Sequence, residues 1–179
     1  MNNSASTKAK IKLKRLPQNK KHFLELMEFF EDVLGICKTL KITPIVEASL
    51  AVFAYTSEPT LKVNDVDMLI PEDTFTTVVG LLKERGFDFE IKEYHVLRVH
   101  KGDMKIEFDS IDYWPKQWNI SIRNIDSYPI LSIGSIAVHI LDLESLIKTY
   151  ESGLENSEQR KDEYKYKVEL LKETRKTRV

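Results

Sequence analysis

The chain has 179 residues, a length typical of one domain, and 42% of its residues are hydrophobic against 31% that are charged. This balance is that of an ordinary soluble globular protein with enough apolar material for a single core. The formal net charge of −1 gives no overall field that would favour nucleic acid or a membrane. The sequence lacks an apolar run of the ~18 residues that span a bilayer. It also lacks an apolar signal core, so we expect a cytoplasmic protein without a membrane partner.

The charge is unevenly distributed along the chain. Residues 1–17 hold five basic residues and no acidic residue, and basic residues return at the C-terminus. These residues are Lys8, Lys10, Lys12, Lys14 and Arg15 in the first group, and Lys172, Arg175, Lys176 and Arg178 in the second. They fit either frayed, solubilising tails or tails that contact a polyanion such as nucleic acid. We expect 1–17 to be a flexible basic tail, 18–140 the folded core, and 141–179 C-terminal helices packed on that core.

The first half of the chain predicts two helices and a short strand. Apolar residues recur at three- and four-residue spacing from about residue 19 to residue 40, which predicts an amphipathic helix. Pro44 cannot continue a helix, and Ile45–Val46 is typical of a short buried strand. Ser49 is positioned to cap a second, short helix over Leu50–Tyr55, which is apolar on nearly all sides and therefore buried.

The second half alternates strands and helices. A strand at 63–70 precedes Pro71, which opens a helix that ends near Gly86. Strands at 96–100 and 104–108 flank a turn at 101–103, residues 111–135 have no clear assignment, and 136–140 predicts a last strand. Asp142 begins a helix, and a charged helix at about 157–175 follows Gly153. This order predicts an α/β or α+β fold, with a mixed sheet and helices on one side.

The segment 64–70 carries the chemistry. Side chains alternate between the faces of a strand, so Asp65 and Asp67 point to one face and Val66 and Met68 to the other. Two carboxylates ~7 Å apart on one face repel each other, and a divalent cation between them removes that repulsion. Oxygen-only ligation favours Mg²⁺.

A second acidic strand lies downstream, where Glu107 and Asp109 share a face opposite Ile106 and Phe108. If this strand lies beside the first, Glu107 adjoins the aspartate pair, and three carboxylates are able to hold two metal ions. The alternative is that these acids belong to half-exposed antiparallel strands. Asp is poorly suited to strands, however, which favours the metal-site interpretation.

Taken in chain order, these features resemble the DNA polymerase beta-type nucleotidyltransferase superfamily. The resemblance is greatest to its small bacterial members, such as the lincosamide, aminoglycoside and toxin-like nucleotidyltransferases. Those families show an apolar strand, a Gly-Ser turn, a short helix, an Asp-x-Asp strand and a later acidic residue. The corresponding segments here are Ile45-Val46, Glu47-Ala48-Ser49, Leu50–Tyr55, Asp65-Val66-Asp67 and Ile106-Glu107-Phe108. The resemblance covers about residues 20–172.

The resemblance implies a nucleotidyltransferase-like mixed sheet with flanking helices and a C-terminal helical segment. It implies Mg²⁺-dependent transfer of a nucleoside monophosphate from an NTP to a hydroxyl of a small molecule, RNA or protein. Asp65 and Asp67 would bind the metals, and Glu107 would act as third ligand and base. Asp109 would take that place if the strand register differs. A monomer and a homodimer are both compatible with such an enzyme.

The same resemblance implies a phosphate-binding turn. Ser49 and Ala48 would meet the nucleotide phosphates at a helix N-terminus. Lys161 and Arg160 are further candidates for binding phosphate, or for a solvated helix face. The turn departs from the family, since Glu47 and Ala48 occupy positions where glycines let the backbone approach phosphate. The departure leaves open a catalytically impaired protein that acts as a binding or toxin–antitoxin-type module. An unrelated scaffold with fortuitous acids is the third possibility.

Trp114 and Trp118 flank Pro115 in the unassigned segment. They fit either a role as core anchors or a role in stacking on a planar acceptor or base.

Overall fold

The computed structural model describes residues 9–93 and 95–177. Within this part of the chain, eight strands form one mixed sheet in the order β1-β7-β8-β2-β3-β6-β5-β4. The strands are β1 (Lys10–Lys12), β2 (Ile45–Glu47), β3 (Asp65–Ile70), β4 (Asp88–Lys92), β5 (Val96–Lys101), β6 (Met104–Ser110), β7 (Ile130–Ile133) and β8 (Ile136–Ile140). The mixed α/β architecture that the sequence predicts is confirmed.

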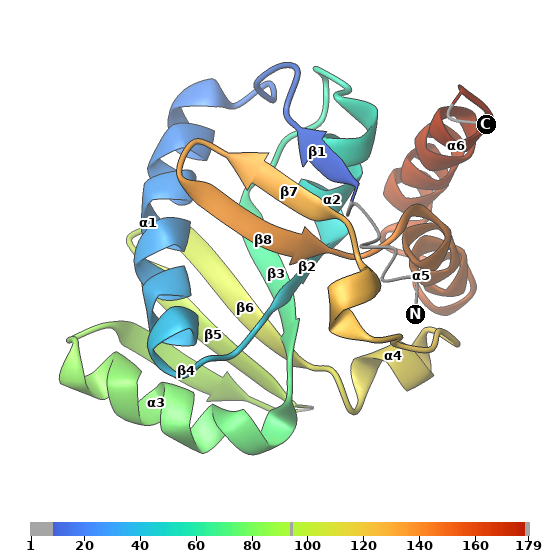
Figure 1. The fold of residues 1–179 in the computed structure, drawn as a ribbon. Coiled ribbons are helices and arrows are strands. Elements are labelled where there is room, and N and C mark those ends of the chain that lie inside the picture. Colours follow the sequence, from blue (N-terminus) through green and yellow to red (C-terminus); the bar gives the residue numbers. More distant parts are fainter. Residues whose placement is uncertain (1–8, 94, 178–179) are drawn as a thin grey trace, which may run out of the picture.

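Helices cover the sheet in two groups. The α-helices are α1 (Lys20–Thr39), α2 (Ala48–Thr56), α3 (Phe75–Glu84), α4 (Trp114–Gln117), α5 (Leu143–Asn156) and α6 (Lys161–Thr177), and the 3₁₀ turns are η1 (Glu72–Thr74) and η2 (Ile125–Ser127). Figure 1 shows α1 and α3 together at one side, whereas α5 and α6 lie together at the other, where both contact α2. None of the helices in the described residues has the length and apolar character needed to cross a membrane.

The predicted first helix is confirmed as α1, and its apolar stripe forms much of the core. Phe23, Phe30 and Val33 are completely buried, and burial of each such side chain contributes roughly 1.5–3 kcal/mol. Phe23 meets Phe53 of α2 edge to face, with ring centroids 6.2 Å apart. The two helices are thereby joined through the core.

The central strands place the acidic residues. β3 pairs with β2 in antiparallel fashion and with β6 in parallel. Val66 and Met68 are completely buried on one face of β3, so the alternation of the strand leaves Asp65 and Asp67 on the opposite face. The predicted two-faced strand is therefore present, and its acidic face looks away from the buried Val66 and Met68.

Part of the segment expected to be a flexible tail belongs to the sheet. Lys10–Lys12 form β1, which runs parallel to β7 with Ile11 opposite Leu131. Ile11 is 7% exposed, so burial of this one apolar side chain and pairing with β7 hold the segment. Lys8 and Arg178, which also belong to the expected basic tails, lie outside the described residues.

Several boundaries differ from those predicted. β4 was not predicted, β7 and α4 lie in the segment without assignment, and the helix expected directly after Pro71 begins with the 3₁₀ turn η1. The helix that begins after Asp142, α5, runs through Gly153 to Asn156. A Cβ atom at Gly153 would lie 2.8 Å from the Tyr164 ring. This glycine therefore permits close packing of α5 on α6 and does not terminate α5.

Candidate functional site

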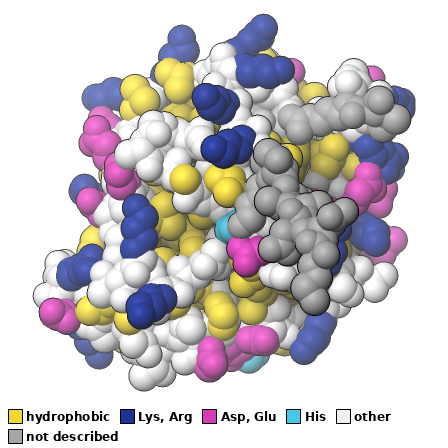
Figure 2. All heavy atoms as spheres, in the orientation of Figure 1, with side chains coloured by type: hydrophobic (Ala, Val, Ile, Leu, Met, Phe, Trp, Pro, Cys, Tyr) yellow, Lys and Arg dark blue, Asp and Glu magenta, His cyan; other side chains and the backbone are white. Residues whose placement is uncertain are grey.

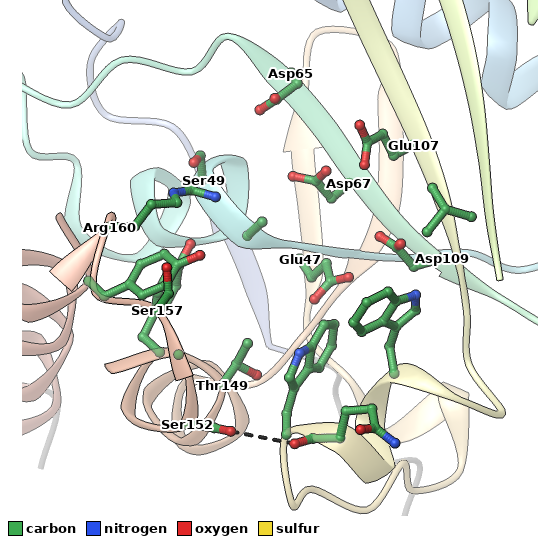
Figure 3. A pocket seen from close by; sticks show the side chains of 18 of the residues that line it. Glu47, Ser49, Asp65, Asp67, Glu107, Asp109, Thr149, Ser152, Ser157 and Arg160 are labelled. Carbon is green, nitrogen blue, oxygen red and sulfur yellow. Dashed lines mark hydrogen bonds between the residues drawn. The ribbon is translucent and has the colours of Figure 1, made fainter. Parts of the chain in front are cut away.

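A cavity of about 790 Å³ lies over the acidic face of the sheet. Strands β2, β3, β5 and β6 form its floor, and α2, α4, α5 and the residues before α6 form its walls (Figure 3). Its lining includes acidic residues (Glu47, Asp65, Asp67, Glu107, Asp109), basic residues (Arg98, Lys105, Arg160), aromatic residues (Tyr113, Trp114, Trp118, Tyr150, Tyr164) and small polar residues (Ser49, Thr149, Ser152, Asn156, Ser157). The cavity collects every site residue predicted from the sequence except Lys161.

Three carboxylates form a compact group. One oxygen from each of Asp67, Glu107 and Asp109 lies within 4.8 Å of the others. The parallel register makes this possible, since Asp67 stands directly beside Glu107 and Asp109 follows two residues later on the same face. Two unit charges ~5 Å apart repel by about 3 kcal/mol at an effective dielectric constant of ~20. The arrangement is thus suited to a divalent cation or to partial protonation.

Glu47 adds a fourth carboxyl group, which sequence reasoning placed in the phosphate turn. It is the register partner of Asp67 across β2 and β3 and is 3% exposed. Burial, followed by the charges of Asp109 and Asp67, raises the pKa of Glu47 well above its usual value. Hydrogen bonding between the Glu47 and Asp109 side chains acts to raise the pKa of Glu47 further. Glu47 therefore lies at the floor of the carboxylate group, where burial favours the protonated form of its side chain.

The pKa values of the neighbouring acids are raised as well. Burial, with a contribution from the charge of Glu107, raises the pKa of Asp109 to about 7, although the hydrogen bond with Glu47 acts to lower it. Burial and the charge of Asp65 raise the pKa of Asp67. The clustered carboxyl groups therefore resist ionising together in the metal-free chain, and a bound cation would relieve the repulsion between them.

Two of the predicted ligands already have cationic partners. Lys105 Nζ lies 3.3 Å from Asp65 Oδ2. Arg98 pairs with Glu107 at 2.5 Å and with Glu90 at 3.1 Å. Asp65 lines the cavity, but the compact group among the described residues consists of Asp67, Glu107 and Asp109. Asp109 therefore belongs to the carboxylate group together with Glu107 and does not replace it.

The turn at the start of α2 keeps a glycine-like backbone without a glycine. Ala48 has φ +50°, in the left-handed region that costs a residue with a Cβ atom roughly 1–2 kcal/mol. Ser49 does not cap the helix as predicted, because α2 begins at Ala48 and Glu47 precedes it. Instead, Lys167 Nζ donates a hydrogen bond of 3.0 Å to Ser49 Oγ. The turn is therefore fixed by a side chain from α6.

The predicted phosphate ligand Lys161 does not reach the cavity. Its ammonium group pairs with Glu158 at 3.0 Å, and its neighbour Arg160 lines the cavity in its place. Arg160 lies over the Tyr164 ring, 4.9 Å from its centroid, and donates two hydrogen bonds of 3.0 Å to Glu163. Figure 3 shows Arg160 and Ser49 on the opposite side of the cavity from Glu107 and Asp109.

Lys167 and Arg160 share Glu163 as a partner. Lys167 is 4% exposed, and its Nζ lies 2.6 Å from Glu163 Oε1. Partial burial acts to raise the pKa of Glu163, but hydrogen bonds from Arg160 and Lys167 lower it to about 2. The result is a cationic side of the cavity that faces an anionic side.

An aromatic wall adjoins the carboxylates. Trp114 and Trp118 stack with ring centroids 5.9 Å apart, and both pack on the core while lining the cavity. The two roles considered from the sequence are therefore compatible. α4 is tied to α5 where Ser152 Oγ donates to the Gln117 carbonyl at 3.4 Å (Figure 3).

Sequence reasoning missed three charged residues of the site for an identifiable reason. Glu47 was read as a departure from a glycine turn, although a strand before the turn would place it beside Asp67. Arg98 was missed although the turn at Gly102 pairs β5 with β6 and sets Arg98 opposite Glu107. Lys167 lies 118 residues from Ser49, and no local pattern indicates that contact.

Comparisons with known proteins address the fold. No protein-family model matches the sequence, and no curated protein matches it. Several solved structures do match. One is ANT(2'')-Ia in complex with adenylyl-2''-tobramycin, with a TM-score of 0.56, 9% identity, and coverage of 83% of this chain and 87% of that chain.

Two further structures have the same type of fold. An antigenic nucleotidyltransferase-like protein from Paracoccidioides brasiliensis has a TM-score of 0.58 and 14% identity, with coverage of 87% of this chain and 77% of that one. The lincomycin-bound lincosamide antibiotic adenylyltransferase LnuA has a TM-score of 0.50 and 12% identity, with coverage of 87% and 98%. The chain has a nucleotidyltransferase-like fold. At such low identity the likeness concerns the fold alone.

Proposed function

We propose that this chain is a divalent-metal-dependent nucleotidyltransferase that transfers a nucleoside monophosphate from an NTP to a hydroxyl group of a small-molecule acceptor. The observation that carries the proposal is the convergence of Asp67, Glu107 and Asp109 within 4.8 Å at the floor of a cavity of about 790 Å³. The structural neighbours with antibiotic ligands support a small acceptor.

The donor set fits a hard divalent cation. Asp67, Glu107 and Asp109 offer only carboxylate oxygens, and Asp65 is available when Lys105 releases it. We assign the metal-binding role to these four residues and favour Mg²⁺. When bound, the metal would polarise the phosphate oxygens and stabilise the negative charge of the leaving pyrophosphate.

The cationic side of the cavity fits the triphosphate. Ser49 lies in the first turn of α2, where backbone N–H groups and the helix dipole favour an anion. Arg160 lines the same cavity, and Lys167 holds the Ser49 hydroxyl. We assign phosphate binding to Ser49, the backbone of Ala48 and Arg160, in place of Lys161.

The residues of the cavity support transfer of the nucleoside monophosphate to the acceptor hydroxyl group in one step. Glu107 would accept the proton of the acceptor hydroxyl, and the resulting oxygen would attack the α-phosphorus of the NTP. The bond between the α-phosphorus and the oxygen that bridges to the β-phosphorus breaks, and pyrophosphate leaves. Arg98 lies 2.5 Å from Glu107 and would orient that carboxylate towards the acceptor. Trp114 and Trp118 would offer flat faces to the acceptor or to the base.

The test is pyrophosphate release from each of the four NTPs in the presence of Mg²⁺ or Mn²⁺. A panel of aminoglycosides, lincosamides and other polyhydroxylated compounds would supply the acceptors. We expect release with at least one pair of substrates and its loss in Asp67→Asn. Asp73→Asn, at an exposed acid in η1, is the matched control. Equal release from wild type and Asp67→Asn contradicts the assignment.

A second candidate function is a non-catalytic nucleotide-binding module, and the buried Glu47 favours it. Glu47 stands where the family's turn has a glycine, and ionisation of its buried carboxyl group would oppose an NTP. Calorimetry with the four NTPs separates the candidates. Binding without turnover supports the module, turnover supports the transferase, and the absence of binding excludes both.

A further inference from the structure

A second cavity, of about 520 Å³, lies at the β1 edge of the sheet. Residues 12–16 form one side of it and residues 132–134 the other. It shares no lining residue with the carboxylate cavity. In the order of the sheet, β7, β8 and β2 separate β1 from β3, which carries Asp67. We refer to this second cavity as the β1 groove.

The β1 groove is bordered by unneutralised positive charge. Lys10, Lys12, Lys14 and Arg15 are all exposed, and none of them is paired with an acidic side chain in residues 9–93 and 95–177. By contrast, Arg98, Lys105 and Arg160 in the carboxylate cavity each pair with a carboxylate. Residues 1–24 contain no Asp or Glu, so the segment that carries these cations supplies no acid of its own. Figure 2 shows Lys and Arg side chains gathered over the upper part of this face, where Figure 1 places β1.

The strand arranges Lys10 and Lys12 in a row, and Lys14 and Arg15 follow in the bend after β1. Ile11 is buried and faces the core, so alternation turns Lys10 and Lys12 to the opposite, exposed side. Residues two apart on a strand are about 7 Å apart, which is close to the step between successive phosphates of an extended nucleic-acid strand. Pairing of β1 with β7 fixes the row on the surface before any ligand arrives.

The groove also has apolar walls. Leu13 and Ile133 are partly buried against the core, and Leu16 remains 37% exposed. A free phosphate or an inorganic polyphosphate makes no use of apolar surface, whereas nucleobases have apolar faces. A membrane is contacted best by a convex or flat face, and this site is concave. Charge, spacing and apolar walls together favour a single strand of nucleic acid.

We propose that the β1 groove binds single-stranded nucleic acid, with Lys10, Lys12, Lys14 and Arg15 on the phosphates. The site is independent of the proposed transfer reaction, because it uses none of the residues assigned to that reaction. Affinity from backbone cations is salt-dependent, and each neutralised phosphate of a single strand contributes about −0.7 to the slope of log K against log salt. Four contacts therefore predict a slope of about −3.

The experiment is fluorescence anisotropy of a labelled oligouridine of about 12 nucleotides with the full chain, at several salt concentrations. A groove variant replaces Lys10, Lys12, Lys14 and Arg15 with Gln. The matched control variant replaces four exposed lysines that also lack an ion pair in the described structure, Lys38, Lys41, Lys148 and Lys165. We expect the groove variant to bind at least ~10-fold more weakly at about 0.1 M salt, with a flatter slope, and the control variant to bind as wild type does.

Three results would overturn the proposal. The first is an equal loss of affinity in both variants, which indicates unspecific attraction. The second is no binding of the oligonucleotide while vesicles of phosphatidylserine and phosphatidylcholine bind, which indicates a membrane surface. The third is competition by inorganic polyphosphate at the same phosphate concentration as the oligonucleotide, which indicates a general anion site. Should the groove variant misfold by circular dichroism, Lys14→Gln with Arg15→Gln, which lie after β1, replaces it.

Discussion

Asp67 in β3 and Glu107 in β6 are register partners in a parallel pair of strands. The oxygens of these two side chains and of Asp109 approach within 4.8 Å. Strands that are 40 residues apart in the sequence therefore supply one carboxylate group. Because the other face of both strands is completely buried at Val66, Met68 and Ile106, a shift of register by one residue would place the acids in the core. The geometry of the group is accordingly fixed by the packing beneath it.

This geometry predicts that loss of one carboxylate abolishes metal binding. We expect Asp67→Asn and Glu107→Gln each to weaken Mn²⁺ binding by at least ~10-fold, and to lower any transfer rate on the order of 100-fold or more. Calorimetry with Mn²⁺ measures the first effect and pyrophosphate release the second. Asp73→Asn should leave both unchanged. Mn²⁺ binding of wild-type strength in Asp67→Asn would show that the three carboxylates do not form the metal site.

The metal-free protein should become less stable as the pH rises. The pKa of Asp109 is about 7 in the folded chain, against 3.8 for an ordinary Asp, so the folded state holds more protons between these values. The free energy of unfolding then falls with increasing pH through this window. For a shift of this size the fall is roughly 1–4 kcal/mol, and the raised pKa values of Glu47 and Asp67 act in the same direction.

Urea denaturation in EDTA at about pH 5 and about pH 8 measures this fall. Asp109→Asn, which mimics the protonated side chain, should show a smaller difference between the two values. Saturating Mg²⁺ should restore stability at the higher pH, because it binds the ionised folded state. A metal-free wild-type chain that is more stable at about pH 8 than at about pH 5 would refute the prediction.

The left-handed backbone of Ala48 predicts a stabilising substitution. Ala48 has φ +50°, which glycine adopts without the steric cost of a Cβ atom. We expect Ala48→Gly to raise the free energy of unfolding by about 1 kcal/mol. Ala51→Gly, inside the same helix and completely buried, should instead lower it by about 1 kcal/mol or more. A loss of stability in both variants would argue against strain at Ala48.

Replacement of Lys167, whose ammonium group is buried, should lower both the stability of the chain and its affinity for the NTP. Lys167→Met leaves Ser49 Oγ without its donor and Glu163 without one of its two cations. We expect thermal unfolding to show a loss of about 1–3 kcal/mol and KM for the NTP to rise more than kcat falls. Lys165→Met, at an exposed position of the same helix, is the control. Unchanged stability in Lys167→Met would exclude a role for this contact.

Gly153 and Gly80 give a matched pair for helix packing. A Cβ atom at Gly153 would lie 2.8 Å from the Tyr164 ring, whereas at Gly80 it would meet nothing within 4 Å. We expect Gly153→Ala to destabilise the chain by about 1–3 kcal/mol, because α5 and α6 must separate. Gly80→Ala should stabilise α3 by about 0.5–1 kcal/mol. Chemical denaturation of the two variants decides the matter, and stabilisation by both would contradict the close contact.

The local elements and the residue types of the site can be predicted from the amino-acid sequence. The periodicity of 19–40 predicts α1, and the alternation of acids with aliphatic residues predicts the two-faced strand that carries Asp65 and Asp67. The turn at Gly102 likewise predicts the hairpin of β5 and β6. These features are readable because each depends on residues close together in the chain.

Which of these residues lie in contact depends on the packing of the folded chain. Parallel pairing of β3 with β6, and of β1 with β7, joins segments that no periodicity relates. Arg160 lines the cavity and Lys161 does not, because successive residues at the start of a helix point in directions about 100° apart. The burial of Glu47 follows from the strand order that encloses β2 between β8 and β3. Pairing of distant segments depends on the packing of the whole core. Local sequence patterns therefore identify the acidic residues but do not show that their carboxylates converge.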